Sequence, residues 1–165
     1  MKKLLFLITA IFLLASTACA NDNEKAVIAL NKGELSDMKI SIQITSDSGS
    51  HTLAATLVDN SSATAFYELL KQGPVTIKMH DYGNFEKVGP LGTTLPRNDT
   101  QITTTAGDII LYQGNQITIY YDTNSWNFTR LGKVVSTSST TSITQAELKK
   151  IWGKGNVTAV FEILE

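Results

Sequence analysis

The sequence predicts an all-β protein, a closed antiparallel barrel with two short helices covering its ends. Two observations carry this prediction. From about residue 37 onward, apolar and polar side chains alternate along most of the chain, which is the period-2 pattern of half-buried strands. Helical spacing replaces that alternation only twice, once early and once late. Many strands with two short helices indicate a barrel whose ends the helices close.

The first two strands form a predicted hairpin. Residues 37–45 read DMKISIQIT, in which Met38 and three isoleucines share one face and polar side chains share the other. The turn residues SDSGS follow. Residues 51–57 then alternate again, with Leu53 and Leu57 facing inward.

A second hairpin is predicted at residues 109–121, IILY-QGN-QITIYY, with Gly114-Asn115 as its turn. Turn residues abound between 80 and 108, so short strands and long loops are expected there. Further strands are expected at residues 75–79, 125–135 and 156–164.

Both predicted helices have end signals in the sequence. For the first, Asn60 or Ser61 is the N-cap candidate, and Gly73 followed by Pro74 ends the helix. For the second, Thr144 opens a T-x-x-E capping box, and a glycine follows the last apolar residue. The apolar positions are Ala63, Phe66, Tyr67 and Leu70 in the first helix and Leu148, Ile151 and Trp152 in the second.

The opening segment, MKKLLFLITAIFLLASTACA, has the order of a secretory signal. Two lysines precede an apolar run from Leu4 to Ala15, and small residues follow. That run is shorter than the roughly 20 residues that a membrane-spanning helix needs. A cleaved signal is therefore favoured over a retained anchor, and we expect an exported protein of the bacterial cell envelope.

Two cleavage sites overlap in the letters STACA. The first four resemble a bacterial lipobox, although Ser16 stands where that motif usually has an aliphatic residue; cleavage there removes residues 1–18 and leaves Cys19 as a lipid-modified N-terminus. The letters ACA instead fit the A-x-A pattern of ordinary signal peptidase, which would remove residues 1–20. Since Cys19 is the only cysteine and serves no internal disulfide, we favour lipidation and a membrane anchor.

After the signal, residues 19–36 are polar and mixed in composition and are expected to form a flexible tether, and residues 37–165 are long enough for one domain with a core. The chain has 14 basic and 15 acidic side chains; without Lys2 and Lys3 of the signal, 12 remain against 15, a net charge of about −3. No basic run remains. Nucleic-acid binding and docking to anionic lipid therefore lack their usual electrostatic footprint.

Three segments in this order carry a family resemblance: TLVDNSSATAFYELL, FEKVGPLGTTLPRNDTQITTTAGDIILYQGNQITIYY and NSWNFTRLGKV. Their motifs are D-N-x-x-A-x-A-F at a helix opening, then G-D-x-x-L-Y-x-G and F-T-R-L-G. Together they resemble the bacterial cyclophilin-like domain family from about Met38 to Phe161. The resemblance implies a cyclophilin-like barrel of about eight strands with two helices, in agreement with the alternation.

Prolyl isomerases of the true cyclophilin type use an arginine over a hydrophobic floor. The arginine hydrogen-bonds the prolyl nitrogen and so lowers the barrier to amide rotation. Their signature, Arg followed by Phe-Met-x-Gln-Gly-Gly, is absent, because the only two arginines, Arg97 and Arg130, have other neighbours. The resemblance therefore implies the cyclophilin-like barrel but not prolyl isomerase activity. A divergent isomerase that uses Arg130 or Arg97 remains an alternative.

Candidate ligand-binding residues lie mainly in the second half of the chain. Trp126, Phe128 and Arg130 share one face of a strand, and an arginine beside aromatics can stack or bind a carboxylate or amide. Related barrels also tend to carry an acid where Glu86 lies. The alternative is that the aromatics pack in the core and that Glu86 is solvated. The candidate set is Glu86, Tyr112, Tyr120, Trp126, Phe128 and Arg130.

The sequence shows no standard catalytic or metal-binding constellation. It has no G-x-S-x-G elbow, P-loop or dinucleotide fingerprint. His51 and His80 are too isolated for a metal site, and the neighbours His80 and Asp81 would point to opposite faces of a strand. We expect no catalytic residue and no cofactor, and a module that binds a small molecule or peptide. A structural partner of envelope proteins is a further alternative.

Overall fold

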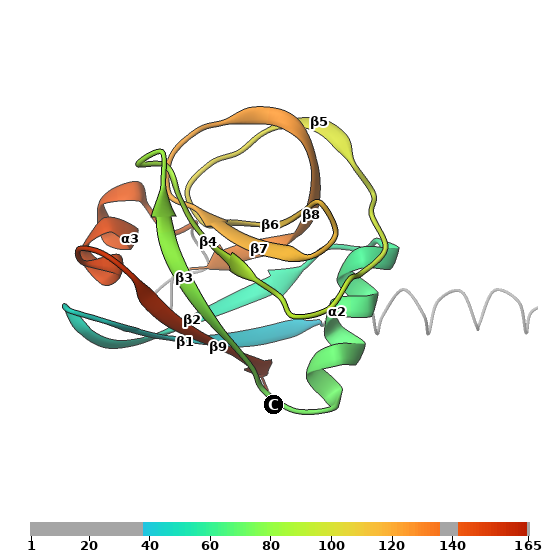
Figure 1. Ribbon diagram of the computed structural model, residues 1–165, viewed down its shortest axis with the longest axis horizontal. Helices are drawn as coiled ribbons and strands as arrows, with labels where there is room; N and C mark the ends of the chain where they lie inside the picture. The colour runs from blue at the N-terminus through green and yellow to red at the C-terminus, as the bar shows by residue number, and fades with distance from the viewer. Residues whose placement is uncertain (1–37, 136–141, 165) are drawn as a thin grey trace, which may run out of the picture.

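A computed structural model describes residues 38–135 and 142–164, which form nine strands and two helices (Figure 1). The predicted signal and the tether fall outside these residues. The helices are α2 (Ser61–Lys71) and α3 (Gln145–Trp152). The strands are β1 (Lys39–Ser46), β2 (Gly49–Leu57), β3 (Val75–Tyr82), β4 (Glu86–Pro90), β5 (Thr100–Thr103), β6 (Asp108–Tyr112), β7 (Gln116–Tyr120), β8 (Ser125–Val135) and β9 (Val157–Ile163).

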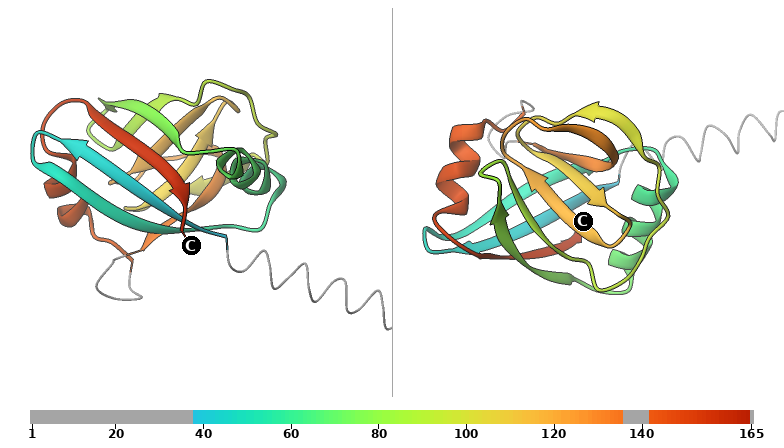
Figure 2. Two further views of the ribbon diagram at one scale, coloured as in Figure 1. Left: turned by 90° about the horizontal axis from the view of Figure 1, so that it is seen from below. Right: turned by 45° about the horizontal axis from the view of Figure 1, so that its top comes forward.

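Eight of these strands close into an antiparallel barrel (Figures 1 and 2). The sheet order is β2-β1-β9-β3-β4-β7-β6-β8-β5, and a pairing between β2 and β8 completes the ring. At this closure Leu57 lies opposite Gly132. β5 pairs only with the first half of β8, which arches away from the barrel in Figure 1. The predicted fold class, a closed antiparallel barrel of about eight strands with two short helices, is confirmed.

Local sequence signals place most element boundaries correctly. β1 and β2 pair along their whole length, as the alternation predicts. The β6–β7 turn was predicted one residue too late: the left-handed residues are Gln113 and Gly114, with φ of 52° and 80°, and not Gly114 and Asn115. The Asn115 N–H bonds the Tyr112 carbonyl, which centres the turn on Gln113 and puts the glycine at the second central position.

The two helices lie at opposite ends of the barrel (Figure 2). α2 begins at Asn60, whose side chain accepts the Ala63 N–H at 2.8 Å. α3 begins at Thr144, which forms the predicted capping box with Glu147. Each helix buries its apolar side in the barrel core, for example Trp152 in α3. The helices therefore complete a core that the strands alone leave open.

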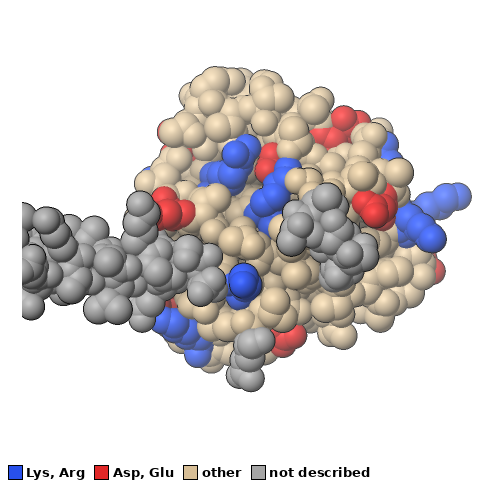
Figure 3. Space-filling model, turned by 180° about the vertical axis from the view of Figure 1, so that it is seen from behind, with Lys and Arg blue, Asp and Glu red and all other residues tan. Residues whose placement is uncertain are grey.

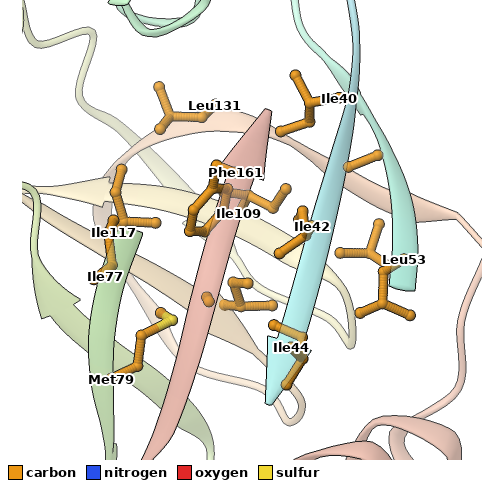
Figure 4. Packing of buried hydrophobic residues seen from close by; sticks show 14 of the residues in the cluster. Ile40, Ile42, Ile44, Leu53, Ile77, Met79, Ile109, Ile117, Leu131 and Phe161 are labelled. Atoms are coloured by element: carbon orange, nitrogen blue, oxygen red, sulfur yellow. The ribbon is translucent and has the colours of Figure 1, made fainter. Parts of the chain in front are cut away.

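The barrel interior is filled by one apolar cluster, part of which is drawn in Figure 4. The alternate residues Ile40, Ile42 and Ile44 of β1 are fully buried there. A second, smaller cluster lies on the outside of the wall, where the arch of β5 and β8 meets β6 and β7. Its buried members are Ile110, Tyr120 and Phe128. This outer cluster supports one side of the candidate site.

Charged side chains are interspersed on the face shown in Figure 3, where blue and red atoms alternate with large uncharged areas. No broad basic surface forms on this face, in agreement with the composition. Among the described residues, no helix is long and apolar enough to cross a membrane.

Candidate functional site

A cavity of about 270 Å³ lies on the outer wall of the barrel, over β3, β4, β6 and β7. We call it the outer cavity. Three tyrosines, Tyr82, Tyr112 and Tyr120, and one carboxylate, Glu86, line it. His80, Val88 and Gln116 complete its lining.

Strand register brings the outer cavity together from segments distant in sequence. Tyr82 of β3 lies opposite Glu86 of β4, and Glu86 lies opposite Tyr120 of β7. One row across three adjacent strands therefore contributes three lining side chains. His80 and Val88 face each other in the next row. Since side chains alternate between the faces of a strand, all five lie on the outer face.

Aromatic rings form a continuous row beside Glu86. Tyr82 meets Phe85 edge-on at 5.9 Å between centroids, and Phe85 stacks on Tyr120 at 6.0 Å. Tyr120 contacts Phe128 at 5.6 Å, and Phe128 meets Tyr112 at 6.4 Å. Aromatic pairs at such distances each add about 1 kcal/mol beyond their buried area. The row thus holds Tyr120 rigidly, while Tyr82, at its end, stays 59 % exposed.

Glu86 is the unusual residue of the outer cavity. Its side chain is only 7 % exposed, and its Oε2 atom is buried without a hydrogen-bond partner among the described residues. Burial raises the pKa of the Glu86 carboxyl; the Tyr120 hydroxyl, as a hydrogen-bond donor, opposes this shift, and the nearby charge of Asp81 adds to it. The alternative of a solvated Glu86 is therefore wrong. An unpartnered buried oxygen is a position that a donor from a ligand can satisfy.

Two other cavities have similar volumes but lack this combination. One, of about 270 Å³, lies over β1, β3 and β9, and its lining includes Lys78 but no Asp, Glu or Tyr. The other, of about 260 Å³, lies beside α3 between Asp81, Tyr121 and Lys149. There Asp81 already accepts a hydrogen bond from Tyr121 and pairs with Lys87. Of these three cavities, only the outer cavity joins an unpartnered buried carboxylate oxygen to several aromatic rings.

Arg130 is held away from the outer cavity. Its guanidinium pairs with Asp108 at 3.3 Å, and Asp108 also accepts from Lys133 at 3.1 Å and from the Thr105 N–H at 2.7 Å. Asp108 is only 2 % exposed, so this network belongs to the packed wall between β6 and β8. Arg97 is also paired, with Asp99, but this pair lies at the surface, where the Arg97 side chain is exposed.

Trp126, Phe128 and Arg130 share the outer face of β8, but they reach three different environments. Trp126 is 61 % exposed and does not line the outer cavity. Phe128 is buried in the outer cluster, where its ring packs against those of Tyr112 and Tyr120. Their common face did not predict a common site, because the first half of β8 leaves the barrel to pair with β5.

Sequence reasoning missed Tyr82 and His80 as lining residues. The signal that could have found them is the alternation of β3, which continues past residue 79 to Tyr82. His80 and Asp81 do face opposite ways, as expected: His80 lines the outer cavity, whereas Asp81 contacts Lys87 and Tyr121. Within the described ranges, no group of three or more His, Cys, Asp or Glu side chains is placed to hold a metal ion.

The fold and the outer cavity together define a small antiparallel barrel with a tyrosine-lined cavity on its outer wall. A family model described as the cyclophilin-like family matches residues 46–161, and the chain belongs to that family. The predicted resemblance to a cyclophilin-like family is thereby confirmed, whereas the bacterial origin stays a prediction. No curated protein matches the chain.

Among solved structures, the chain is similar to the solution structure of a hypothetical protein from Archaeoglobus fulgidus. The two are 11 % identical with a TM-score of 0.53, and the alignment covers 78 % of this chain and 97 % of that one. At this level of identity the likeness concerns the fold alone.

Proposed function

We propose that this cyclophilin-like protein is a non-catalytic binding module whose ligand, a small molecule or peptide, occupies the outer cavity. The observation that carries the proposal is Glu86, a buried carboxyl with an unpartnered oxygen among aromatic rings. Aromatic walls with one or two polar groups that fix orientation are typical of ligand pockets. A bound donor would offset the cost of burying that oxygen.

Binding is favoured over prolyl isomerisation by the positions of the two arginines. An isomerase of the cyclophilin type would need a guanidinium free to reach the prolyl nitrogen. Arg130 is paired with Asp108 and Arg97 with Asp99, and neither lines the outer cavity. The aromatic row supplies a floor without the group that would polarise the amide.

We also propose that the module acts in the cell envelope, tethered by a lipid on Cys19. Support comes from the charged-then-apolar order of residues 1–18, the lipobox-like letters STAC and the single cysteine. Residues 19–36, as a tether, would then hold the barrel close to a membrane surface. Replacing Cys19 by Ala should move the protein from the membrane fraction to the soluble fraction of cells; unchanged partitioning would overturn the lipid anchor.

The binding proposal is tested by NMR titration of the isotope-labelled protein with a panel of small molecules and short peptides, including proline-containing ones. Ligands should shift resonances of the outer cavity. Tyr82→Ala should weaken this binding, whereas Trp126→Ala, a change at a similarly exposed aromatic outside the cavity, should not. Equal effects of the two substitutions, or no shifts at all, would overturn the proposal.

The same peptides also test the isomerase alternative. Exchange between cis and trans proline should not accelerate in the presence of the protein. Faster exchange that disappears in Arg130→Ala or Arg97→Ala would replace binding by catalysis and locate its site.

A further inference from the structure

The chemistry of the outer cavity restricts the class of ligand. Tyr82, Tyr112 and Tyr120 line it, and Tyr82 and Tyr112 are the two ends of the aromatic row. The faces of such rings carry negative electrostatic potential and attract cations that approach within about 6 Å of the ring centre. Several rings around one space are the usual way in which proteins hold an ammonium group without hydrogen-bonding it.

The charges of the lining have the same preference. Glu86 is the only lining residue that is an Asp, Glu, Lys or Arg. Its chain neighbour Lys87 faces the opposite side of β4, where its ammonium lies 3.0 Å from Asp81 and donates to the Gly155 carbonyl. Arg130, on the outer face of β8, is paired with Asp108. A cation entering the cavity would therefore meet one carboxylate and no Lys or Arg in the lining.

Resting on the proposed binding function, we propose that the outer cavity recognises an organic cation, a quaternary ammonium or protonated amine, with Glu86 as its counter-ion between tyrosine rings. The unpartnered Oε2 atom of Glu86 is the position at which a positive charge offsets the cost of burying a carboxylate. An anionic ligand would meet this carboxylate and the negative faces of the rings. A neutral ligand would leave the charge uncompensated.

Cation binding makes a specific pH dependence expected. The groups that face Glu86 are His80 and Tyr82 from β3, Tyr120 from β7 and Tyr112 from β6, and Asp81 acts on it through its charge. Cation binding needs the ionised carboxylate, so affinity should fall as pH drops through the raised pKa of Glu86. His80 also lines the cavity, so a His80→Gln variant isolates the contribution of Glu86 to this pH dependence.

The test uses choline and butylammonium as cationic probes and 3,3-dimethylbutan-1-ol as the neutral isostere of choline. NMR titration of the protein should show resonances of Tyr82, Tyr112 and Tyr120 shifting with at least one cation, bound about tenfold or more tightly than the alcohol. Glu86→Gln should lower the affinity for the cation by about tenfold and leave the affinity for the alcohol unchanged. Trp126→Ala should change neither.

The inference is overturned if the alcohol binds as tightly as choline, if Glu86→Gln leaves cation binding intact, or if neither cation binds. Should another class of ligand from the wider panel bind in the outer cavity, the binding function would stand and only the cation preference would fail. If no ligand of any class shifts these resonances, both proposals fail together. Tyr82→Ala is the companion variant, because Tyr82 is largely exposed and its loss should leave the fold intact.

Discussion

Glu86 and Tyr120 are direct partners across the β4–β7 pairing, and both are buried although they lie on the outside of the barrel wall. Outer positions of a small barrel normally face water. Here Phe85 stacks on Tyr120 from one side, and Phe128 on the arch of β8 contacts it from the other. Burial consequently raises the pKa of both the Glu86 carboxyl and the Tyr120 hydroxyl.

The first prediction concerns pH and stability. Since the folded-state pKa of Glu86 lies above its ordinary value of 4.5, the fold favours the protonated form. This contribution to the free energy of unfolding is fully present below the ordinary pKa and is lost as pH rises through the raised value. Glu86→Gln should therefore gain stability over the parent as pH rises from about 4 to 8, measured by urea unfolding.

Comparison with the variant is needed because other carboxylates act in the opposite sense. The hydrogen bond from Arg97 lowers the pKa of Asp99, so its stabilisation is lost as pH falls. The difference between parent and Glu86→Gln cancels that contribution. If the difference in free energy of unfolding between the parent and Glu86→Gln stays constant across the pH range, the pKa of Glu86 is not raised by burial.

The second prediction concerns Lys87, whose ammonium group is buried with a side-chain exposure of 1 %. Asp81→Asn removes its counter-charge and a hydrogen-bond acceptor of Tyr121. We expect the free energy of unfolding to fall because the buried charge of Lys87 is left without its counter-charge. Since Asp81 itself is partly exposed, the expected loss is only about 2 kcal/mol. Adding Lys87→Met should recover part of the loss. Denaturant unfolding measures both, with the exposed Asp59→Asn as the control.

The third prediction concerns the closure of the barrel. A Cβ atom on Gly132 would lie 2.5 Å from the Thr56 carbonyl oxygen and 3.0 Å from a methyl group of Leu57. Gly132→Ala must push β2 and β8 apart, so we expect a loss of about 2 kcal/mol or more. Asn127→Ala, at an exposed position of the same strand, should change stability by about 0.5 kcal/mol at most. If Gly132→Ala and Asn127→Ala have equal midpoints in thermal unfolding, the close approach of β2 to Gly132 is disproved.

The fourth prediction separates two roles of Asn60. Its side-chain oxygen caps α2, and its Nδ2 atom donates to the Arg130 carbonyl at 2.8 Å, which joins the helix to β8. Asn60→Ala should lose both interactions, about 2 kcal/mol, whereas Asn60→Asp should keep the cap and lose only the donor, about 1 kcal/mol. Chemical unfolding of the two variants distinguishes them. Identical losses would mean that the bond to the Arg130 carbonyl contributes to stability and the cap does not.

Local patterns predicted much of the architecture. Alternation located β1, β2, β3 and the strands after residue 108, because consecutive side chains of a strand point to opposite faces. The cap at Thr144 was predicted correctly, and Asn60 was one of the two candidates named for the cap of α2, since capping involves residues only three positions apart. β4 and β5 could be anticipated only as short strands somewhere in a turn-rich segment, as they alternate over too few residues.

The candidate site was predicted in part. Glu86, Tyr112 and Tyr120 do line one cavity, and Phe128 supports it. Trp126 and Arg130 were grouped with them because all three residues of β8 share a face. Their separation arises from the arch of that strand and from the ion pair with Asp108, which no local pattern reveals. Tyr82 joins the cavity only through its register opposite Glu86.

The sequence by itself determined the alternation, the helix caps and the chemical types available, because each depends on neighbours along the chain. The tertiary structure alone decided that a glutamate on the outside of a strand is buried. Tyr82 and Tyr120 lie beside Glu86 on the two neighbouring strands, and Phe128, from a third part of the chain, packs on Tyr120. Barrel closure sets which strands become neighbours. The burial, the raised pKa and the unpartnered oxygen of Glu86 exist only once those distant segments pack together.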